Sequence, residues 1–296
     1  MVKGLPINRN AVYAALFSPQ GEHGELKLDV VRELIRYELA HGVEGFYVCG
    51  SSGEGLLLDL EERKQLAQTV AEEVAGKVPF IVHTGSLSTR QAIELSQHAE
   101  TLGAAAVSMI PPIYYNYTPD EVMGYYEDVI HNVGLGVIIY NIPQFTGISF
   151  SKDSKLMYDP RIIGIKHTSM NLYDLERIAQ AFPEKVIING HDETWLFSQV
   201  AGATALVGTT VNICPKLYAS VRDNFRAGNI AKAQEEQHMV NDFIEALCKA
   251  GIFPAAKYCL TLLGVDVGPC RHPFLPLDEE RKKMTENALS KLEAYL

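Results

Sequence analysis

The chain has 296 residues, of which 47% are hydrophobic and 21% charged, and its formal net charge at pH 7 is −10. This composition is typical of a soluble globular protein that is large enough to bury a core without disulfides. The acidic balance argues against a nucleic-acid partner, because phosphate binding requires a basic face. An anionic substrate must therefore be captured by local donors.

The five cysteines are scattered, odd in number and without a C-x-x-C pair, which favours free thiols in a reducing compartment. The N-terminus lacks the apolar stretch of a signal peptide, and the chain contains no run of 18 apolar residues. We therefore expect a cytoplasmic protein that does not enter a membrane.

Short apolar runs rich in β-branched residues alternate along the chain with amphipathic stretches of helical length. The apolar runs predict strands at 11–17, 45–49, 78–83, 105–110, 135–140, 162–167, 185–189 and 204–208. The stretches between them predict helices at 28–41, 59–75, 88–102, 119–132, 171–182 and 192–201, with a shorter helix near 151–157. Residues 214–296 are predicted to be helical, with no convincing strand in 228–264.

Strands this uniformly apolar are buried on both faces, as in parallel sheets. Eight of them in about 210 residues fit a (β/α)8 TIM barrel. A doubly wound open sheet would instead place a G-x-G-x-x-G turn after its first strand, and residues 18–21, Ser-Pro-Gln-Gly, do not fit that pattern. We expect a single domain over 1–296, with the barrel at 8–227 and a C-terminal helical extension at 228–296.

The active site of such a barrel lies in the loops at the carboxyl ends of the strands. Polar segments follow the predicted strands at 50–54, 83–85, 114–116, 140–143, 166–169, 190–193 and 208–210. These segments are therefore expected to meet at one mouth.

Lys166 is the most informative residue, because it lies in an otherwise apolar strand and lysine is almost never buried unless it is paired or functional. Burial penalises the ammonium form and leaves an amine that can form a Schiff base with a carbonyl. The alternative is a lysine whose charged end reaches water from the strand end. Lys257 is a rival, although long side chains on helices more often cover apolar surface.

Two neighbouring segments carry groups that suit the same chemistry. Tyr140 ends the preceding strand, so its phenol could relay protons beside Lys166, or it could be a core tyrosine with a satisfied hydroxyl. Residues 50–54, Gly-Ser-Ser-Gly-Glu, offer hydroxyls and backbone N–H groups to a carboxylate. The alternative for this segment is an ordinary turn in which serine caps the next helix.

Residues 50–54, Tyr140-Asn-Ile-Pro143 and Gly164-Ile-Lys166-His-Thr168, in this order and spacing, resemble the N-acetylneuraminate (sialic acid) lyase and dihydrodipicolinate synthase family. The resemblance runs from about residue 10 to near the C-terminus. It implies a homotetramer of (β/α)8 barrels that uses no metal and no cofactor. It also implies that Lys166 forms an imine with pyruvate or its adduct, that Tyr140 transfers protons, and that Ser51 and Ser52 hold the keto-acid carboxylate.

The resemblance extends to the substrate class. Synthases of this family carry a carboxylate-binding arginine where this chain has Phe145, and a phenyl ring cannot pair with a carboxylate. The segment Gly190-x-Asp192-Glu193 of this chain instead resembles the corresponding segment of the lyases. Its two carboxylates could accept hydrogen bonds from a sugar tail. From the residues alone, the favoured interpretation of the acidic pair is a helix start that matches the dipole, since acidic first turns are common. Further implied substrate-lining residues are Thr168, Thr209 and Phe253. The resemblance also implies that Tyr114, with its neighbour Tyr115, lies near the substrate site or at the subunit contact.

The chain departs from the lyase pattern at Ser52, where threonine is frequent, and at His191, where an aromatic residue is usual. The expected reaction is Schiff-base cleavage of sialic acid to N-acetylmannosamine and pyruvate. Alternatives within the family are a 2-keto-3-deoxy sugar acid aldolase or a dihydrodipicolinate synthase. An alternative of another class is a non-catalytic keto-acid sensor.

Overall fold

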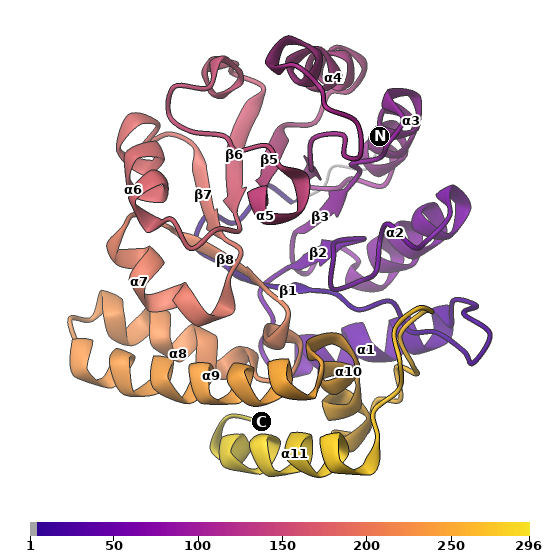
Figure 1. Ribbon diagram of the computed structural model, residues 1–296, viewed down its shortest axis with the longest axis vertical. Coiled ribbons are helices and arrows are strands. Elements are labelled where there is room, and N and C mark those ends of the chain that lie inside the picture. The colour runs from indigo at the N-terminus through magenta and orange to yellow at the C-terminus, as the bar shows by residue number, and fades with distance from the viewer. Residues whose placement is uncertain (1–4) are drawn as a thin grey trace.

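The computed structural model of the protein describes residues 5–296, in which eight parallel strands close into a barrel in the order of the sequence (Figure 1). The strands are β1 (Val12–Ala15), β2 (Phe46–Val48), β3 (Phe80–His83), β4 (Ala106–Met109), β5 (Val137–Asn141), β6 (Ile162–His167), β7 (Val186–Asn189) and β8 (Ala205–Gly208). Pairing of β1 with β8 completes the barrel. The predicted (β/α)8 fold and all eight predicted strands are confirmed, most of them shorter by one or two residues at an end.

Helices follow the strands and form the outer ring. They are α1 (Leu28–Ala40), α2 (Leu60–Val74), α3 (Thr89–Thr101), α4 (Pro119–Asn132), α5 (Pro143–Thr146), the 3-10 helix η1 (Lys155–Tyr158), α6 (Leu172–Ala181), η2 (Asp192–Thr194), α7 (Trp195–Val200), η3 (Thr210–Asn212) and α8 (Pro215–Arg226). The single helix predicted at 192–201 is thus divided into η2 and α7, and the short α5 was not predicted. Capping boxes start α2 and α4, where Asp59 and Thr118 exchange hydrogen bonds with Glu62 and Glu121.

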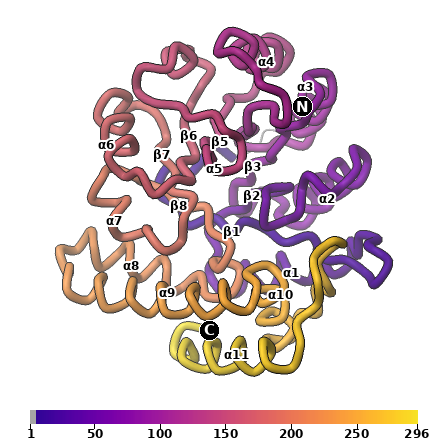
Figure 2. Tube along the Cα trace, in the orientation of Figure 1, coloured from indigo at the N-terminus to yellow at the C-terminus, as the bar shows by residue number. Residues whose placement is uncertain are grey.

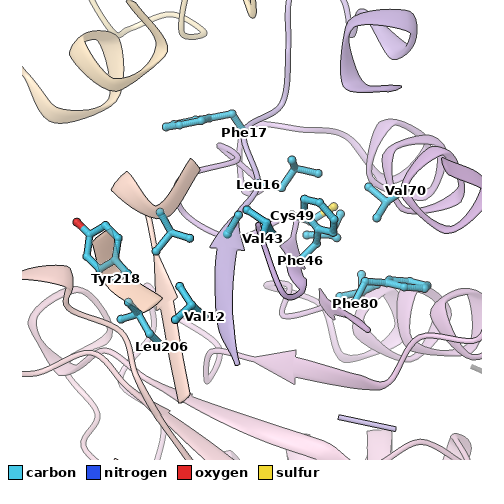
Figure 3. Close-up of a cluster of buried hydrophobic side chains, with 14 of the residues drawn as sticks. Val12, Leu16, Phe17, Val43, Phe46, Cys49, Val70, Phe80, Leu206 and Tyr218 are labelled. Carbon is cyan, nitrogen blue, oxygen red and sulfur yellow. The ribbon is translucent and has the colours of Figure 1, made fainter. Parts of the chain in front are cut away.

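Alternation along each strand separates two apolar layers. In β1, Val12 and Ala14 belong to the layer between the strands and the helices, whereas Tyr13 and Ala15 belong to the barrel interior. Figure 3 shows part of the outer layer around β1, with Leu206 of β8 close by. The interior layer contains tyrosines as well as aliphatic residues, so the barrel is filled by side chains.

The C-terminal residues continue as α9 (Ile230–Ala250), α10 (Ile252–Leu262), α11 (Glu279–Leu289) and η4 (Ser290–Tyr295). Helix α9 packs along α8 and also contacts α10 and α11. Figure 2 shows the segment between α10 and α11 passing close to the loop that precedes α1, and Gln20 N donates to Val267 O there at 3.0 Å. Among the helices of residues 5–296, none has the length and apolarity needed to cross a membrane.

Candidate active site

Lys166 and Tyr140 lie side by side inside the barrel. The two residues are register partners in the parallel pair β5–β6, and neighbours in register point to the same side of a sheet. The Lys166 Nζ atom lies 3.7 Å from the centroid of the Tyr140 ring and 4.8 Å from that of Tyr47. Both members of the pair are buried, with 4% and 2% of their surface exposed. The predicted neighbourhood of these two residues is thus present.

Lys166 differs from the two other buried lysines of residues 5–296. Lys185 donates to the carbonyl oxygens of Asp159 and Ile162, at 3.1 and 2.5 Å. Lys257 forms an ion pair with Glu54 and donates to two further carbonyl oxygens. No carboxylate and no backbone carbonyl of the described chain holds the Lys166 nitrogen. Lys166 is therefore the buried lysine whose amine is available for chemistry.

The Tyr140 hydroxyl is electrostatically tuned by its surroundings. Burial alone would raise the pKa of Tyr140, but the charge and hydrogen bonding of Lys166 outweigh it and lower the pKa below the usual value. A hydrogen bond with Ser51 acts in the same direction, and the Ser51 Oγ atom lies 3.3 Å from the phenol oxygen. A phenol of lowered pKa beside an amine can exchange a proton with it.

Ser51 and Ser52 present their hydroxyls at the start of the β2–α2 connection. Ser51 is exposed and contacts Tyr140, whereas Ser52 is 5% exposed and its Oγ atom lies 2.7 Å from Thr209 Oγ1. The structure therefore brings the loop after β2 to the end of strand β5 and to the loop after β8. Neither serine caps α2, because Asp59 occupies that position.

Thr168 and Gly190 lie together beside Lys166. The Thr168 hydroxyl is buried without a hydrogen-bond partner in residues 5–296. A Cβ atom at Gly190 would stand 1.9 Å from this hydroxyl and 3.3 Å from Lys166 Cε. A residue without a side chain is therefore required at position 190 for the loop after β7 to pass this close to the lysine.

Asp192 is buried and turned toward Thr210. Its Oδ2 atom accepts hydrogen bonds from the backbone N–H and the hydroxyl of Thr210, at 2.8 and 2.6 Å, while Oδ1 has no partner within residues 5–296. Burial raises the pKa of Asp192 to about 6, although the bonds from Thr210 oppose the shift. Asp192 does begin the 3-10 helix η2, as the alternative interpretation of the acidic pair has it, but its side chain is only 6% exposed.

Glu193 is half-buried and pairs with His191, whose Nδ1 atom lies 3.2 Å from Glu193 Oε1. Burial acts to raise the pKa of Glu193, but the hydrogen bond and charge of His191, together with a backbone hydrogen bond, outweigh it and lower the pKa. His191, one of the two residues at which the chain departs from the lyase pattern, therefore contacts one of the two acidic groups expected to bind the tail.

Two residues that the resemblance implies, Tyr114 and Phe253, pack against other aromatic rings of the chain. Tyr114 remains 88% exposed and packs edge-on against Tyr115 at 5.0 Å. Phe253 lies in α10 and packs edge-on against Phe274 at 5.7 Å. Phe145 is 76% exposed, so the place of the synthase arginine is taken by an exposed ring.

Sequence reasoning placed His83 at the barrel mouth but did not single it out, and it missed Tyr47 and Arg63. Tyr47 donates to Ser108 at 2.9 Å, and the rings of Tyr47 and His83 both pack against Tyr140. Burial lowers the pKa of His83 well below its usual value, and the cations Arg63 and Lys166 lower it further. Arg63 donates to His83 O at 2.7 Å. Tyr47 could have been found, since a tyrosine in an apolar strand is the same signal that singled out Lys166.

A closed parallel barrel with a buried lysine beside a tyrosine at its mouth is the arrangement of a (β/α)8-barrel enzyme. The sequence model of the Dihydrodipicolinate synthetase family matches residues 8–292, and the chain belongs to this family. No cluster of three His, Cys, Asp or Glu side chains suited to hold a metal occurs among residues 5–296.

Named relatives are similar along almost the whole chain. A protein of Rhizobium meliloti (strain 1021) named N-acetylneuraminate lyase is 38% identical over 269 residues, which are 90% of each chain. A protein of the same name from Lactiplantibacillus plantarum is 36% identical over 271 residues, covering 90% of this chain and 93% of the relative. The crystal structure of CdNal from Clostridium difficile in complex with mannosamine has a TM-score of 0.94 at 31% identity, over 98% of this chain and 100% of that one.

Proposed function

We propose that this enzyme is an N-acetylneuraminate lyase that cleaves sialic acid to N-acetylmannosamine and pyruvate through a Schiff base on Lys166. The observation that carries the proposal is the pair formed by Lys166 and Tyr140, with the amine 3.7 Å from the ring centroid and free of other anionic partners in the described chain. The substrate is inferred from the two relatives named N-acetylneuraminate lyase and from the acidic groups after β7.

In the proposed reaction the Lys166 amine attacks the C2 ketone of the open-chain sugar, and loss of water gives a protonated imine. The imine accepts the electron pair of the C3–C4 bond as that bond breaks, while Tyr140 takes the proton of the C4 hydroxyl. The resulting enamine is protonated at C3, and water releases pyruvate from the lysine. Tyr140 is suited to this role because its pKa is lowered beside Lys166.

The surrounding residues are proposed to orient the substrate. Ser51 and Ser52 hold the carboxylate, and Tyr140 lies within reach of Ser51. The groups proposed to bind the sugar tail are Thr168, Gly190, Asp192, Glu193, Thr209 and Phe253. The unpartnered oxygens of Thr168 and Asp192 support this assignment, because a buried polar atom without a partner is costly unless a ligand satisfies it. Orientation of this kind can contribute up to about 7 kcal/mol.

The proposed assembly is a homotetramer in the cytoplasm. Tyr114 and Tyr115 are 88% and 69% exposed, and large exposed rings of this kind suit burial against a second copy of the chain. The free cysteines suit a reducing compartment. Light scattering tests the assembly, and a stable monomer at micromolar concentration would refute it.

The reaction is tested by borohydride reduction in the presence of pyruvate, followed by peptide mass spectrometry. We expect a reduced pyruvate adduct on Lys166 and none on the buried Lys185 or Lys257, which serve as internal controls. Incubation with sialic acid should release N-acetylmannosamine, whereas 2-keto-3-deoxygluconate, or aspartate semialdehyde with pyruvate, should react poorly. A pyruvate adduct on Lys166 without release of N-acetylmannosamine would support the Schiff-base mechanism but would refute sialic acid as the substrate.

A further inference from the structure

The loop that carries Ser51 and Ser52 is bounded at both ends by strained backbone. Cys49 and Glu54 have φ angles of 60° and 53°, a left-handed conformation that residues other than glycine rarely adopt. The loop closes tightly on itself, because Gly55 N donates to Gly50 O at 3.0 Å. Strain of this kind persists only where the surroundings impose it, and it gathers at functional sites.

A buried ion pair holds the second strained residue. Glu54 Oε1 lies 2.6 Å from Lys257 Nζ, and the two side chains are only 1% and 2% exposed. Removing two charges from water is costly, so stability alone is weak reason to bury such a pair. Lys257 also donates to Ser18 O and Pro269 O, at 3.2 and 2.9 Å. The Lys257 side chain therefore connects helix α10 to the β2–α2 connection.

Further bonds connect the same loop to the residues before and after it. The hydroxyl of Ser18 donates to Gly53 O at 2.6 Å. The backbone carbonyl of the same residue accepts the hydrogen bond from Lys257. The second oxygen of Glu54 accepts from Arg271 N at 2.6 Å. Arg271 in turn donates to Leu57 O at 2.7 Å. The loop is thus fastened from the β1 side and from the C-terminal extension.

We propose that Glu54 and Lys257 are positioning residues for the carboxylate of the keto-acid substrate. The inference rests on the proposed function, because it assigns to this pair the placement of Ser51 and Ser52. With the pair intact, the loop is held so that the Ser51 Oγ atom lies 3.3 Å from Tyr140 and that of Ser52 2.7 Å from Thr209. Without it, the left-handed residue at position 54 can relax and both hydroxyls move. The C-terminal extension is then part of the substrate site.

The pair contacts neither Lys166 nor Tyr140 in the described structure, so its loss should weaken capture of the substrate more than the chemistry. We expect Glu54→Gln and Lys257→Met to raise the pyruvate concentration that half-saturates borohydride trapping by about tenfold. The rate of trapping at saturating pyruvate should change by less than about threefold. A variant that merely unfolds would instead lose trappable protein at an unchanged half-saturation.

The matched control is Lys249→Met, which breaks the exposed pair between Lys249 and Glu245 of α9, 2.6 Å apart. This variant should trap pyruvate like the unaltered enzyme. Failure of the unaltered enzyme to trap pyruvate on Lys166 would refute the proposed function. Normal trapping by the unaltered enzyme, with half-saturation in folded Glu54→Gln within about twofold of it, would overturn the positioning role alone.

The double variant Glu54→Gln/Lys257→Met leaves no unpaired buried charge and decides the question if the single variants do not fold. A folded double variant with raised half-saturation would support the positioning role. A folded double variant with unchanged half-saturation, or one that also fails to fold, would overturn it, since the pair would then serve folding and not substrate placement.

Discussion

Replacing Asp192 by asparagine should stabilise the enzyme at neutral and alkaline pH while it impairs the proposed sugar site. The carboxyl group is 6% exposed, and one of its oxygens has no partner in the described chain. Its pKa is about 6 in the folded chain, against 3.8 for an unperturbed aspartate. A difference of this size corresponds to about 3 kcal/mol.

The sign follows from proton binding. Between pH 3.8 and 6 the folded chain holds the Asp192 proton more tightly than the unfolded chain does, so stability falls as the pH rises through this window. Above pH 6 the ionised Asp192 lowers the free energy of unfolding by the full amount of about 3 kcal/mol. At pH 5 it lowers the free energy of unfolding by about half of that amount. Asp192→Asn removes this dependence. Any change in hydrogen bonding to Thr210 adds a contribution that does not vary with pH.

Urea-induced unfolding measures the effect, and the single tryptophan, the buried Trp195 three residues away, reports it. The free energy of unfolding of Asp192→Asn is compared with that of the unaltered protein at each pH. The difference in favour of the variant should be about 1.5 kcal/mol larger at pH 8 than at pH 5. Asp128→Asn, at an exposed position of α4, is the matched control. The Asp192→Asn variant should still form the pyruvate adduct on Lys166. A stability difference that is constant from pH 5 to 8 would refute the reasoning.

Three further substitutions test other parts of the site and core. Tyr140→Phe should lower the rate of sialic acid cleavage by about 10²- to 10⁴-fold with little change in melting temperature; a loss below tenfold in steady-state assays would count against proton transfer by this phenol. Gly190→Ala places a Cβ atom 1.9 Å from the Thr168 hydroxyl, so pyruvate trapping should slow by at least tenfold, and unchanged trapping would show that the loop yields without cost. Glu38→Met removes two buried oxygens that lack partners in residues 5–296, which should stabilise the fold by about 1–3 kcal/mol. Because burial raises the pKa of Glu38, the gain should be larger at pH 8 than at pH 5, and calorimetry showing equal gains would contradict this account.

The barrel could be predicted because its strands are buried on both faces and therefore appear as apolar runs. The same property made Lys166 conspicuous, and its pairing with Tyr140 followed from two neighbouring parallel strands that end at the same mouth. Helix ends were less accessible to prediction. The division between η2 and α7 at Trp195 depends on tertiary contacts, since Leu196 N donates to Gln237 of α9.

Long-range polar contacts could not be predicted from the sequence. The partner of Glu54 lies 203 residues further along the chain, in a helix whose pattern leaves the direction of Lys257 open. Likewise, the hydrogen bonds from Thr210 to Asp192 depend on how the loops after β7 and β8 approach one another. Tyr114 was assigned to the site by resemblance alone, and a single chain leaves it in solvent.

Closure of the barrel by β1 and β8 has a consequence for the order of events during synthesis. The first strand has no partner on one side until Ala205–Gly208 has left the ribosome, so the barrel cannot close before then. The ion pair between Glu54 and Lys257 forms later still, because Lys257 follows β8 in the chain. The loops after β2 and β8, which meet through Ser52 and Thr209, can therefore come together only late in translation.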